Sequence, residues 1–169
     1  MVAPQMVLTP DGTQPSDFDE FYRARFQGLT LQLYAYIGDL AEAQDLVQEA
    51  FCRAFVRWKK IGTYDDPTSW VRRVAWNLAN SRFRVRRSAR AFLHGQRQTV
   101  VPGPDPDRVA LVRALATLPP RHRRAVVLHH MAQLSVGEIA VQEGVAEGTV
   151  KSWLSRGRAA LAAQLRGDL

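Results

Sequence analysis

The sequence contains a single cysteine, no long apolar run and no signal-peptide pattern. One cysteine, Cys52, excludes an internal disulfide and a zinc site built from cysteines, and we expect it on a helix beside the core. No stretch approaches the roughly 20 apolar residues that a membrane-spanning helix needs. Residues 1–15 carry Asp11 and lack a basic start, so they do not resemble a signal peptide. These absences predict a cytoplasmic protein that does not act at a membrane.

Candidates for catalysis or metal binding are equally scarce. His122, His129 and His130 are the histidines that lie nearest one another. Adjacent side chains on a helix point about 100° apart, and no acid between Asp107 and Glu138 is present to support a metal ion. Phosphate-binding glycine loops, nucleophile elbows and paired carboxylates are also missing. We therefore predict that the chain is not an enzyme and has no catalytic residues, metal, cofactor or small-molecule substrate.

Acidic residues are absent from one long block of the chain. Lysine and arginine number 23 against 16 aspartates and glutamates, which gives a formal charge of +7. Residues 67–100 contain eight arginines and no acid, whereas residues 1–66 contain ten acids and six bases. Positive charge concentrated in one block favours a polyanionic partner, either nucleic acid or an acidic membrane surface.

Two helices joined by a tight turn are predicted over Ser135–Leu161. Ser135 and Glu138 have the spacing of a capping box, and Gly144 permits the left-handed conformation that ends a short helix. The second helix begins near Glu147. Its inner side is predicted to contain Val150, Leu154, Gly157 and Leu161. Its outer side is predicted to contain Lys151, Ser152, Ser155, Arg156 and Arg158. A helix pair with a cationic, hydroxyl-rich outer face is typical of the helix-turn-helix that binds a DNA major groove.

Two helices are predicted before the arginine block. The first begins at Ser16 and ends at Gly38, with an aromatic-rich stripe toward the core. The second runs from about Ala41 to Trp58 and is expected to turn inward Leu46, Val47, Ala50, Phe51, Ala54, Phe55 and Trp58. Its other face carries Glu42, Asp45, Gln48, Glu49 and Arg53. Either solvation or docking of a basic partner protein accounts for that acidic face, and the residues leave both interpretations open.

A third helix is predicted over Pro67–Arg90, after a loop at Lys59–Asp66. Its inner side consists of Val71, Val74, Ala75 and Leu78. Its outer side is expected to include Trp70, Arg72, Arg73, Trp76, Asn77, Asn80, Arg82 and Arg84. Indoles among arginines and amides suit single-stranded nucleic acid, because bases stack on aromatic rings while cations hold phosphates. The apolar side is too small for a helix that lies on a membrane.

The pattern predicts an all-α chain with two small helical domains joined by a flexible linker. Prolines and glycines without apolar periodicity mark residues 95–106 as linker. Two short helices, near 109–118 and 121–131, precede the helix-turn-helix. The predicted division is a flexible segment at 1–15, a first domain at 16–92, the linker at 93–106 and a second domain at 107–169.

Three motifs resemble extracytoplasmic-function (group 4) sigma factors of bacterial RNA polymerase. They are AEAQDLVQEAFCRAF at Ala41–Phe55, SWVRRVAWNLANSRFR at Ser69–Arg84, and LPPRHRRAVVLHH at Leu118–His130 followed by the helix-turn-helix. Their order matches the family, and the resemblance covers nearly everything from residue 18 to 165. It implies sigma domain 2, a linker and sigma domain 4. The chain departs from the family pattern at Ser81, where aspartate is common, and at Trp153, where arginine is usual.

The resemblance implies an alternative sigma factor that binds core RNA polymerase, recognises the −35 and −10 promoter elements and promotes strand opening. Polymerase binding would fall to Asp45, Gln48, Glu49 and Arg53. Contacts with the −10 element would fall to Gly62, Tyr64, Asp65, Trp70, Arg73, Trp76, Asn77, Asn80 and Arg84. Contacts with the −35 element would fall to Glu147, Thr149, Lys151, Ser152, Ser155, Arg156 and Arg158. The implied partners are core polymerase and promoter DNA, both duplex and melted, with an anti-sigma factor as a further candidate.

Two rival functions agree with the same residues. A stand-alone helix-turn-helix regulator would use the N-terminal helices for sensing or dimerisation and would bind duplex DNA tightly without polymerase. An RNA-binding protein would use the arginine-rich helix and bind RNA and promoter DNA with comparable affinity. A sigma factor binds promoter DNA weakly alone and supports transcription only with core enzyme.

Overall fold

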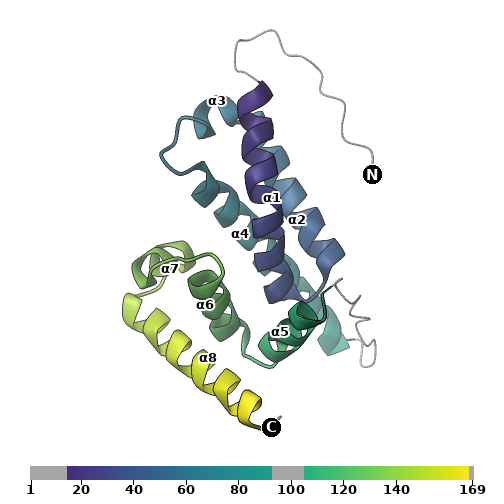
Figure 1. Ribbon diagram of the computed structural model, residues 1–169, viewed down its shortest axis with the longest axis vertical. Coiled ribbons are helices and arrows are strands. Elements are labelled where there is room, and N and C mark those ends of the chain that lie inside the picture. The colour runs from purple at the N-terminus through teal and green to yellow at the C-terminus, as the bar shows by residue number, and fades with distance from the viewer. Residues whose placement is uncertain (1–14, 93–104, 168–169) are drawn as a thin grey trace.

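A computed structural model describes residues 15–92 and 105–167, with side chains at 17–85 and 105–167, and these residues form helices without strands (Figure 1). The elements are α1 (Pro15–Ile37), α2 (Leu40–Val56), α3 (Trp58–Ile61), α4 (Pro67–Phe92), α5 (Pro106–Ala116), α6 (Pro120–His130), α7 (Val136–Glu143) and α8 (Glu147–Gly167). The predicted all-α class is confirmed. Of the predicted flexible segment at 1–15 and the predicted linker at 93–106, residues 1–14 and 93–104 lie outside the described residues. No helix in the described ranges is both long enough and apolar enough to cross a membrane.

Helices α1 to α4 form the N-terminal domain, in which α1 packs against α2 and α4 (Figure 1). Gly38, at φ +84°, ends α1 as predicted, since glycine adopts this conformation without strain. Asp39 then caps α2 by accepting a hydrogen bond of 3.0 Å from the backbone N–H of Glu42. The core between these helices is apolar and includes Leu33, Leu46, Phe51, Val71 and Ala75.

Four expectations for this domain are wrong in detail. Phe55, expected inside, is 47% exposed, although its ring lies 5.0 Å from that of Phe18. Glu42, expected on the exposed acidic face, is buried in the first turn of α2. Cys52, expected beside the core, is exposed. The predicted loop from residue 59 to 66 begins late, because the short helix α3 continues through Ile61, whose buried side chain anchors it.

Helices α5 to α8 form the C-terminal domain, and their ends follow the sequence closely. Ser135 and Glu138 make the predicted capping box, with hydrogen bonds of 3.1 Å and 2.7 Å, and the Ser135 backbone N–H lowers the pKa of Glu138. Gly144 ends α7 at φ +66°, and α8 begins at Glu147 as predicted. Helix α5 starts at Pro106, the last residue of the predicted linker, with Asp105 as its cap.

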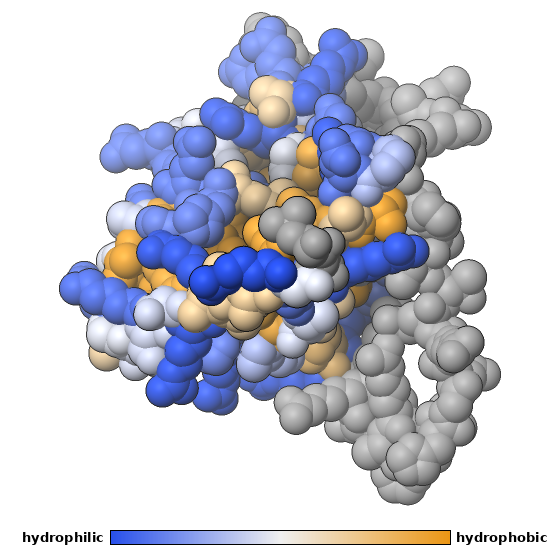
Figure 2. All heavy atoms as spheres, turned by 60° about the horizontal axis from the view of Figure 1, so that its bottom comes forward, coloured by the Kyte–Doolittle hydropathy of each residue, from blue (hydrophilic) through white to orange (hydrophobic). Residues whose placement is uncertain are grey.

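The end of α1 is enclosed by both domains, since it contacts α5 and α6 as well as α2 and α4 (Figure 1). Four consecutive residues, Leu33, Tyr34, Ala35 and Tyr36, are therefore at most 3% exposed. A helix that packs on one side only cannot bury four residues in succession. Hydrophilic side chains project from the end of the molecule where α5 and the end of α8 lie, with more apolar side chains between them (Figure 2).

Close packing of α8 on α6 depends on Gly157. A Cβ atom at this position would lie 2.7 Å from Cγ2 of Val126, a buried β-branched residue with little freedom to move. We expect Gly157→Ala to lower the free energy of unfolding by about 1–3 kcal/mol, as overpacking in a core does. Urea unfolding followed by circular dichroism measures the change.

The matched control is Gly148→Ala in the same helix, where no atom lies within 4 Å of the added Cβ. Alanine there should leave stability unchanged or raise it by up to about 1 kcal/mol through helix propensity. Equal effects of the two substitutions would contradict the packing argument.

Candidate nucleic-acid interface

The outer face of α8 presents the predicted −35 side chains to solvent. Buried Val150 and Leu154 fix the rotation of the helix against its neighbours, so the polar side must face outward. The exposed residues are Glu147, Lys151, Ser155, Arg156 and Arg158, and the half-buried ones are Thr149 and Ser152. Cationic and hydroxyl side chains in this arrangement can contact phosphates and base edges in a major groove.

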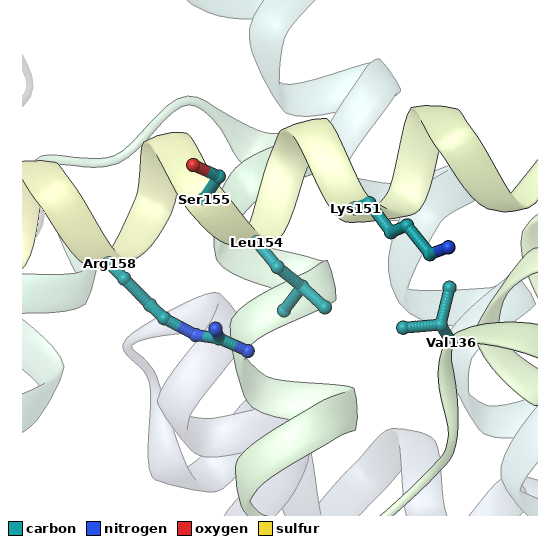
Figure 3. Close-up of a pocket in the computed structure, with 5 residues that line it drawn as sticks. All are labelled: Val136, Lys151, Leu154, Ser155 and Arg158. Carbon is teal, nitrogen blue, oxygen red and sulfur yellow. The ribbon is translucent and has the colours of Figure 1, made fainter.

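A hollow of about 380 Å³ lies beside this face (Figure 3). Its lining combines Val136 of α7 with Lys151, Leu154, Ser155 and Arg158 of α8. In Figure 3 the cationic side chains of Lys151 and Arg158 extend on either side of Leu154. Cations around an apolar floor suit a DNA edge, because phosphates bind the cations and a thymine methyl packs on apolar groups.

The histidines near α8 have partners close to them in the chain. Nδ1 of His129 lies 2.8 Å from the backbone carbonyl oxygen of Leu134, so this ring nitrogen has a hydrogen-bond partner five residues away in the chain. Burial, together with the neighbouring His129 and Arg158, lowers the pKa of His130. Among the residues that the structure describes, no group of three histidine, cysteine, aspartate or glutamate side chains could hold a metal ion.

On α4, the arginine-rich helix, one row of predicted −10 residues is exposed and another is not. Arg73, Asn77 and Arg84 are exposed, at spacings of four and seven residues that place them on one face. Trp70 is half-buried. This face can hold phosphates through its two guanidinium groups and bond bases through the Asn77 amide.

The expectation that Arg72 and Trp76 lie on the outside of α4 is wrong. Arg72 is 8% exposed and Trp76 is 1% exposed, with the Trp76 ring centroid 5.1 Å from that of Tyr36. Asn80 is half-buried and accepts a hydrogen bond of 3.1 Å from Arg124 of α6. The error has a physical source, because the C-terminal domain and Tyr36 cover this side of α4. The periodicity of α4 itself does not show that either neighbour lies there.

The loop between α3 and α4 carries the remaining −10 candidates. Gly62, Tyr64 and Asp65 are exposed, and Tyr64 is 38% exposed. A Cβ on Gly62 would lie 2.9 Å from the backbone oxygen of Trp58, so the turn after α3 requires glycine at this position. The loop therefore exposes polar and aromatic side chains to solvent, next to a turn whose backbone conformation is constrained at Gly62.

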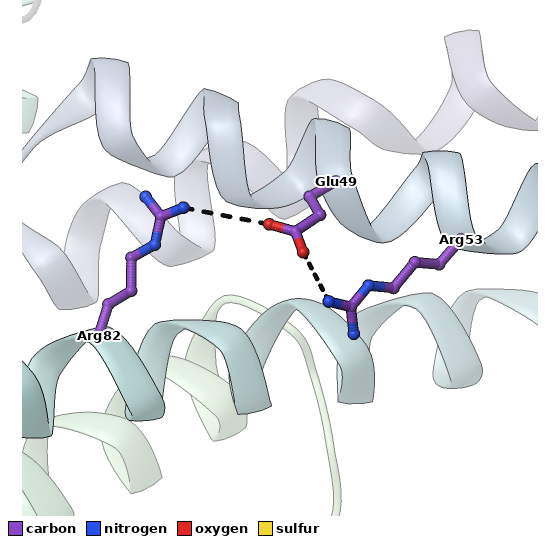
Figure 4. A network of polar contacts seen from close by, with 3 residues as sticks. All are labelled: Glu49, Arg53 and Arg82. Carbon is purple, nitrogen blue, oxygen red and sulfur yellow. Dashed lines mark hydrogen bonds and ion pairs between the residues drawn. The ribbon is translucent and has the colours of Figure 1, made fainter.

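The acidic face of α2 is available to a partner at Asp45, which is exposed, and at Glu49, which is partly exposed. Glu49 lies between two guanidinium groups, 2.6 Å from Arg53 and 4.0 Å from Arg82 of α4 (Figure 4). Gln48 is half-buried and accepts a hydrogen bond of 2.7 Å from the Tyr22 hydroxyl group. The four predicted polymerase contacts thus share one face, on which Glu49 is already paired.

Several functional candidates were not found by sequence reasoning: Tyr36, Arg123, Arg124 and Gln142. All four make polar contacts between the domains, and such contacts join residues between 44 and 88 positions apart in the chain. Nothing in the local pattern of either domain signals these pairs.

Comparison with known proteins matches both domains. Residues 22–89 match the Sigma-70 region 2 family, and residues 108–161 match the Sigma-70, region 4 family. The RNA polymerase sigma-E factor of Streptomyces coelicolor is 32% identical over 152 residues, which cover 88% of this chain and 86% of that protein. The ECF RNA polymerase sigma factor SigW of Bacillus subtilis is 29% identical over 168 residues, with 89% and 88% covered.

Among solved structures, the fold is similar to that of the sigma factor RpoE from Bartonella quintana, determined in complex with the anti-sigma factor NepR. The TM-score is 0.76 at 23% identity, and the match covers 91% of this chain and 99% of that one. Because both sigma regions match in order and a relative is 32% identical over most of both chains, the chain belongs to the extracytoplasmic-function family of RNA polymerase sigma factors.

Proposed function

We propose that this alternative sigma factor, which acts in transcription initiation with core RNA polymerase, contacts the −35 element through α8 and the −10 element through α4 and the loop before it. The observation that carries the proposal is that each of the two sigma domains exposes a separate cationic face. Arg73 and Arg84 are exposed on α4, and Lys151, Arg156 and Arg158 are exposed on α8. The acidic face of α2 would then bind the polymerase.

Two weak contacts on one chain give a specific complex. Each domain binds a short DNA patch, and the linker and polymerase fix the spacing, so the second contact is effectively intramolecular. Extruding a base from the stack costs a few kcal/mol, which contacts from the α3–α4 loop and the exposed face of α4 would offset. Catalysis belongs to the polymerase, and this chain acts as a non-catalytic initiation factor.

The finer assignments belong to the same proposal. We place the chain in group 4 of the sigma factors, because the matched regions end at residue 89 and resume at 108, which leaves little room for another domain between them. We place its action in the cytoplasm, where core polymerase and promoter DNA are found. The domain limits at 16–92 and 107–169 are part of this proposal, and an anti-sigma factor is a further candidate partner.

A stand-alone regulator is not favoured, because residues 22–89, most of the first domain, match sigma region 2. Run-off transcription with purified core polymerase on a pool of genomic promoters, followed by mapping of start sites, tests the proposal. Transcripts that require both proteins support it. Tight binding to duplex sites without polymerase, together with no polymerase-dependent transcript, would favour the regulator instead.

We expect Lys151→Ala and Arg156→Ala to lower initiation about tenfold at a promoter identified in this way, since each removes an exposed cation from the predicted groove-facing side of α8. Run-off yield at subsaturating sigma factor measures the effect. Arg166→Ala is the matched control, because it removes the same charge from an exposed position near the end of the same helix. The prediction fails if the control loses as much activity as the two variants.

We expect Arg73→Ala and Asn77→Ala to slow promoter opening about three- to tenfold, because they remove exposed groups from the predicted single-strand face of α4. Permanganate footprinting over time on duplex DNA and on a pre-melted template measures opening. The defect should be smaller on the pre-melted template. The control is Arg82→Ala, which removes an arginine from the opposite side of α4, beside Glu49. If Arg73→Ala and Asn77→Ala slow opening equally on both templates, a role of these residues in opening is contradicted.

A further inference from the structure

The hollow beside α8 has an apolar wall to which two helices contribute. Val136, the first residue of α7, is half-buried and lines the hollow together with Leu154 of α8. In Figure 3 both aliphatic side chains lie on the same side of α8. The capping box of Ser135 and Glu138 encloses Val136 and sets the first turn of α7. The apolar wall therefore has a fixed position relative to this turn.

Cations lie at both ends of the apolar wall. Lys151 and Arg158 are exposed and seven residues apart, which is about 10 Å along a helix. In Figure 3 the Lys151 side chain extends toward Val136, and the Arg158 side chain extends past Leu154. Phosphates of one DNA strand can bind these cations on either side of a base. The charge of the hollow therefore matches a strand whose base edge faces the apolar wall.

The charged side chains of the hollow supply hydrogen-bond donors. The ammonium group of Lys151 and the guanidinium group of Arg158 donate several hydrogen bonds and accept none. None of the five lining residues is an acid, and Ser155 is the one among them with a hydroxyl group. An acceptor on a base edge is therefore favoured in this hollow, and an amino group is disfavoured.

Thymine is the base that matches both properties of the hollow. In the major groove it presents the O4 acceptor beside its C5-methyl group. Cytosine presents an amino donor in place of O4, and neither cytosine nor the purines carry a methyl group. The apolar wall can hold the thymine methyl group while the Lys151 ammonium group donates a hydrogen bond to O4.

We propose that the hollow is a thymine subsite within the −35 contact, in which Val136 is the specificity-determining residue and Lys151 donates to O4. This subsite rests on the function proposed above, because it takes α8 as the helix that enters the major groove at the −35 element. It adds a residue of α7 to that contact and names the base, and neither follows from the outward cations of α8.

Replacement of thymine by uracil tests the contact with the methyl group, because uracil keeps O4 and its base pairing and lacks that group alone. Each thymine of the −35 element of a mapped promoter is replaced in turn, on both strands. We expect one replacement to lower the affinity of the holoenzyme about three- to fivefold, as the loss of one buried methyl group does. Competition of the two promoters for limiting holoenzyme measures this ratio, and a ratio near one at every thymine would overturn the subsite.

Val136→Ala connects the response to the hollow. Alanine removes two methyl groups from the apolar wall, so the preference for thymine over uracil should fall below about twofold. The matched control is Val141→Ala, which removes the same groups from a side chain of the same helix that is 72% exposed, and it should keep the full preference. A loss of folding lowers the affinity for both promoters alike and leaves their ratio unchanged. Equal preferences in the two variants would contradict the role of Val136.

A 5-methylcytosine at the responding position separates recognition of the methyl group from recognition of O4. This base has the methyl group of thymine but presents an amino donor in place of O4. With guanine opposite, we expect it to lower the affinity about tenfold or more relative to thymine, as a wrong base pair does. An affinity equal to that of thymine would overturn the assignment of thymine and of Lys151 as the donor to O4.

The methyl contact is also measurable without polymerase. The full chain is incubated at low salt with a random duplex pool made with thymine or with uracil, and the bound sequences are read. We expect thymine to be enriched at one position in the first pool, and uracil to lose that enrichment in the second. If the wild-type chain supports no transcript, the proposed function fails, while this comparison still decides the methyl contact. Equal enrichment from the two pools would overturn it.

Discussion

The two helical domains meet at a buried cation. Arg123 is 8% exposed, and its guanidinium donates to the backbone oxygens of Tyr36, Ala116 and Leu118, at or just beyond the ends of α1 and α5. The last carbonyl groups of a helix lack partners within it and carry partial negative charge. Burial lowers the pKa of Arg123, but these carbonyls supply both the hydrogen bonds and the compensating charge that a buried cation needs. This contact joins the C-terminal domain to the end of α1, beside the apolar packing of α5 and α6 on the same helix.

The contact between the domains combines apolar burial, as at Tyr34 and Ala35 of α1, with a set of hydrogen-bonded polar groups. Within the domains the buried residues are almost all apolar, as Phe51 and Val71 are in the first and Leu128 and Ile139 in the second. The hydrogen bonds between the domains join guanidinium, amide, hydroxyl and carbonyl groups. Water can replace such polar partners when the domains separate.

Features set by neighbouring residues could be predicted from the sequence. The capping box at Ser135 and Glu138, the left-handed Gly144 and the outward cations of α8 each depend on residues within one or two helical turns. The acidic face of α2 was predicted less well. Glu42 is buried, although its spacing from Asp45 and Glu49 places it on the same side of the helix as those residues. The consecutive burial of Tyr34 and Ala35 could not be predicted, since it requires the second domain to cover the side of α1 that the first leaves open.

The most informative error concerns Arg72 and Trp76, because here the pattern of α4 disagrees with what its neighbours cover. Considered alone, α4 has a small apolar stripe, and arginine, indole and amide groups beside that stripe are expected in solvent. A guanidinium, an indole and an amide are also the groups that bind phosphates, stack on bases and bond base edges. The C-terminal domain covers the same groups with an amide from Gln142 and a guanidinium from Arg124. Neither of these partners can be found from the periodicity of α4, so the burial of Arg72 and the half-burial of Asn80 could not be predicted from that pattern alone.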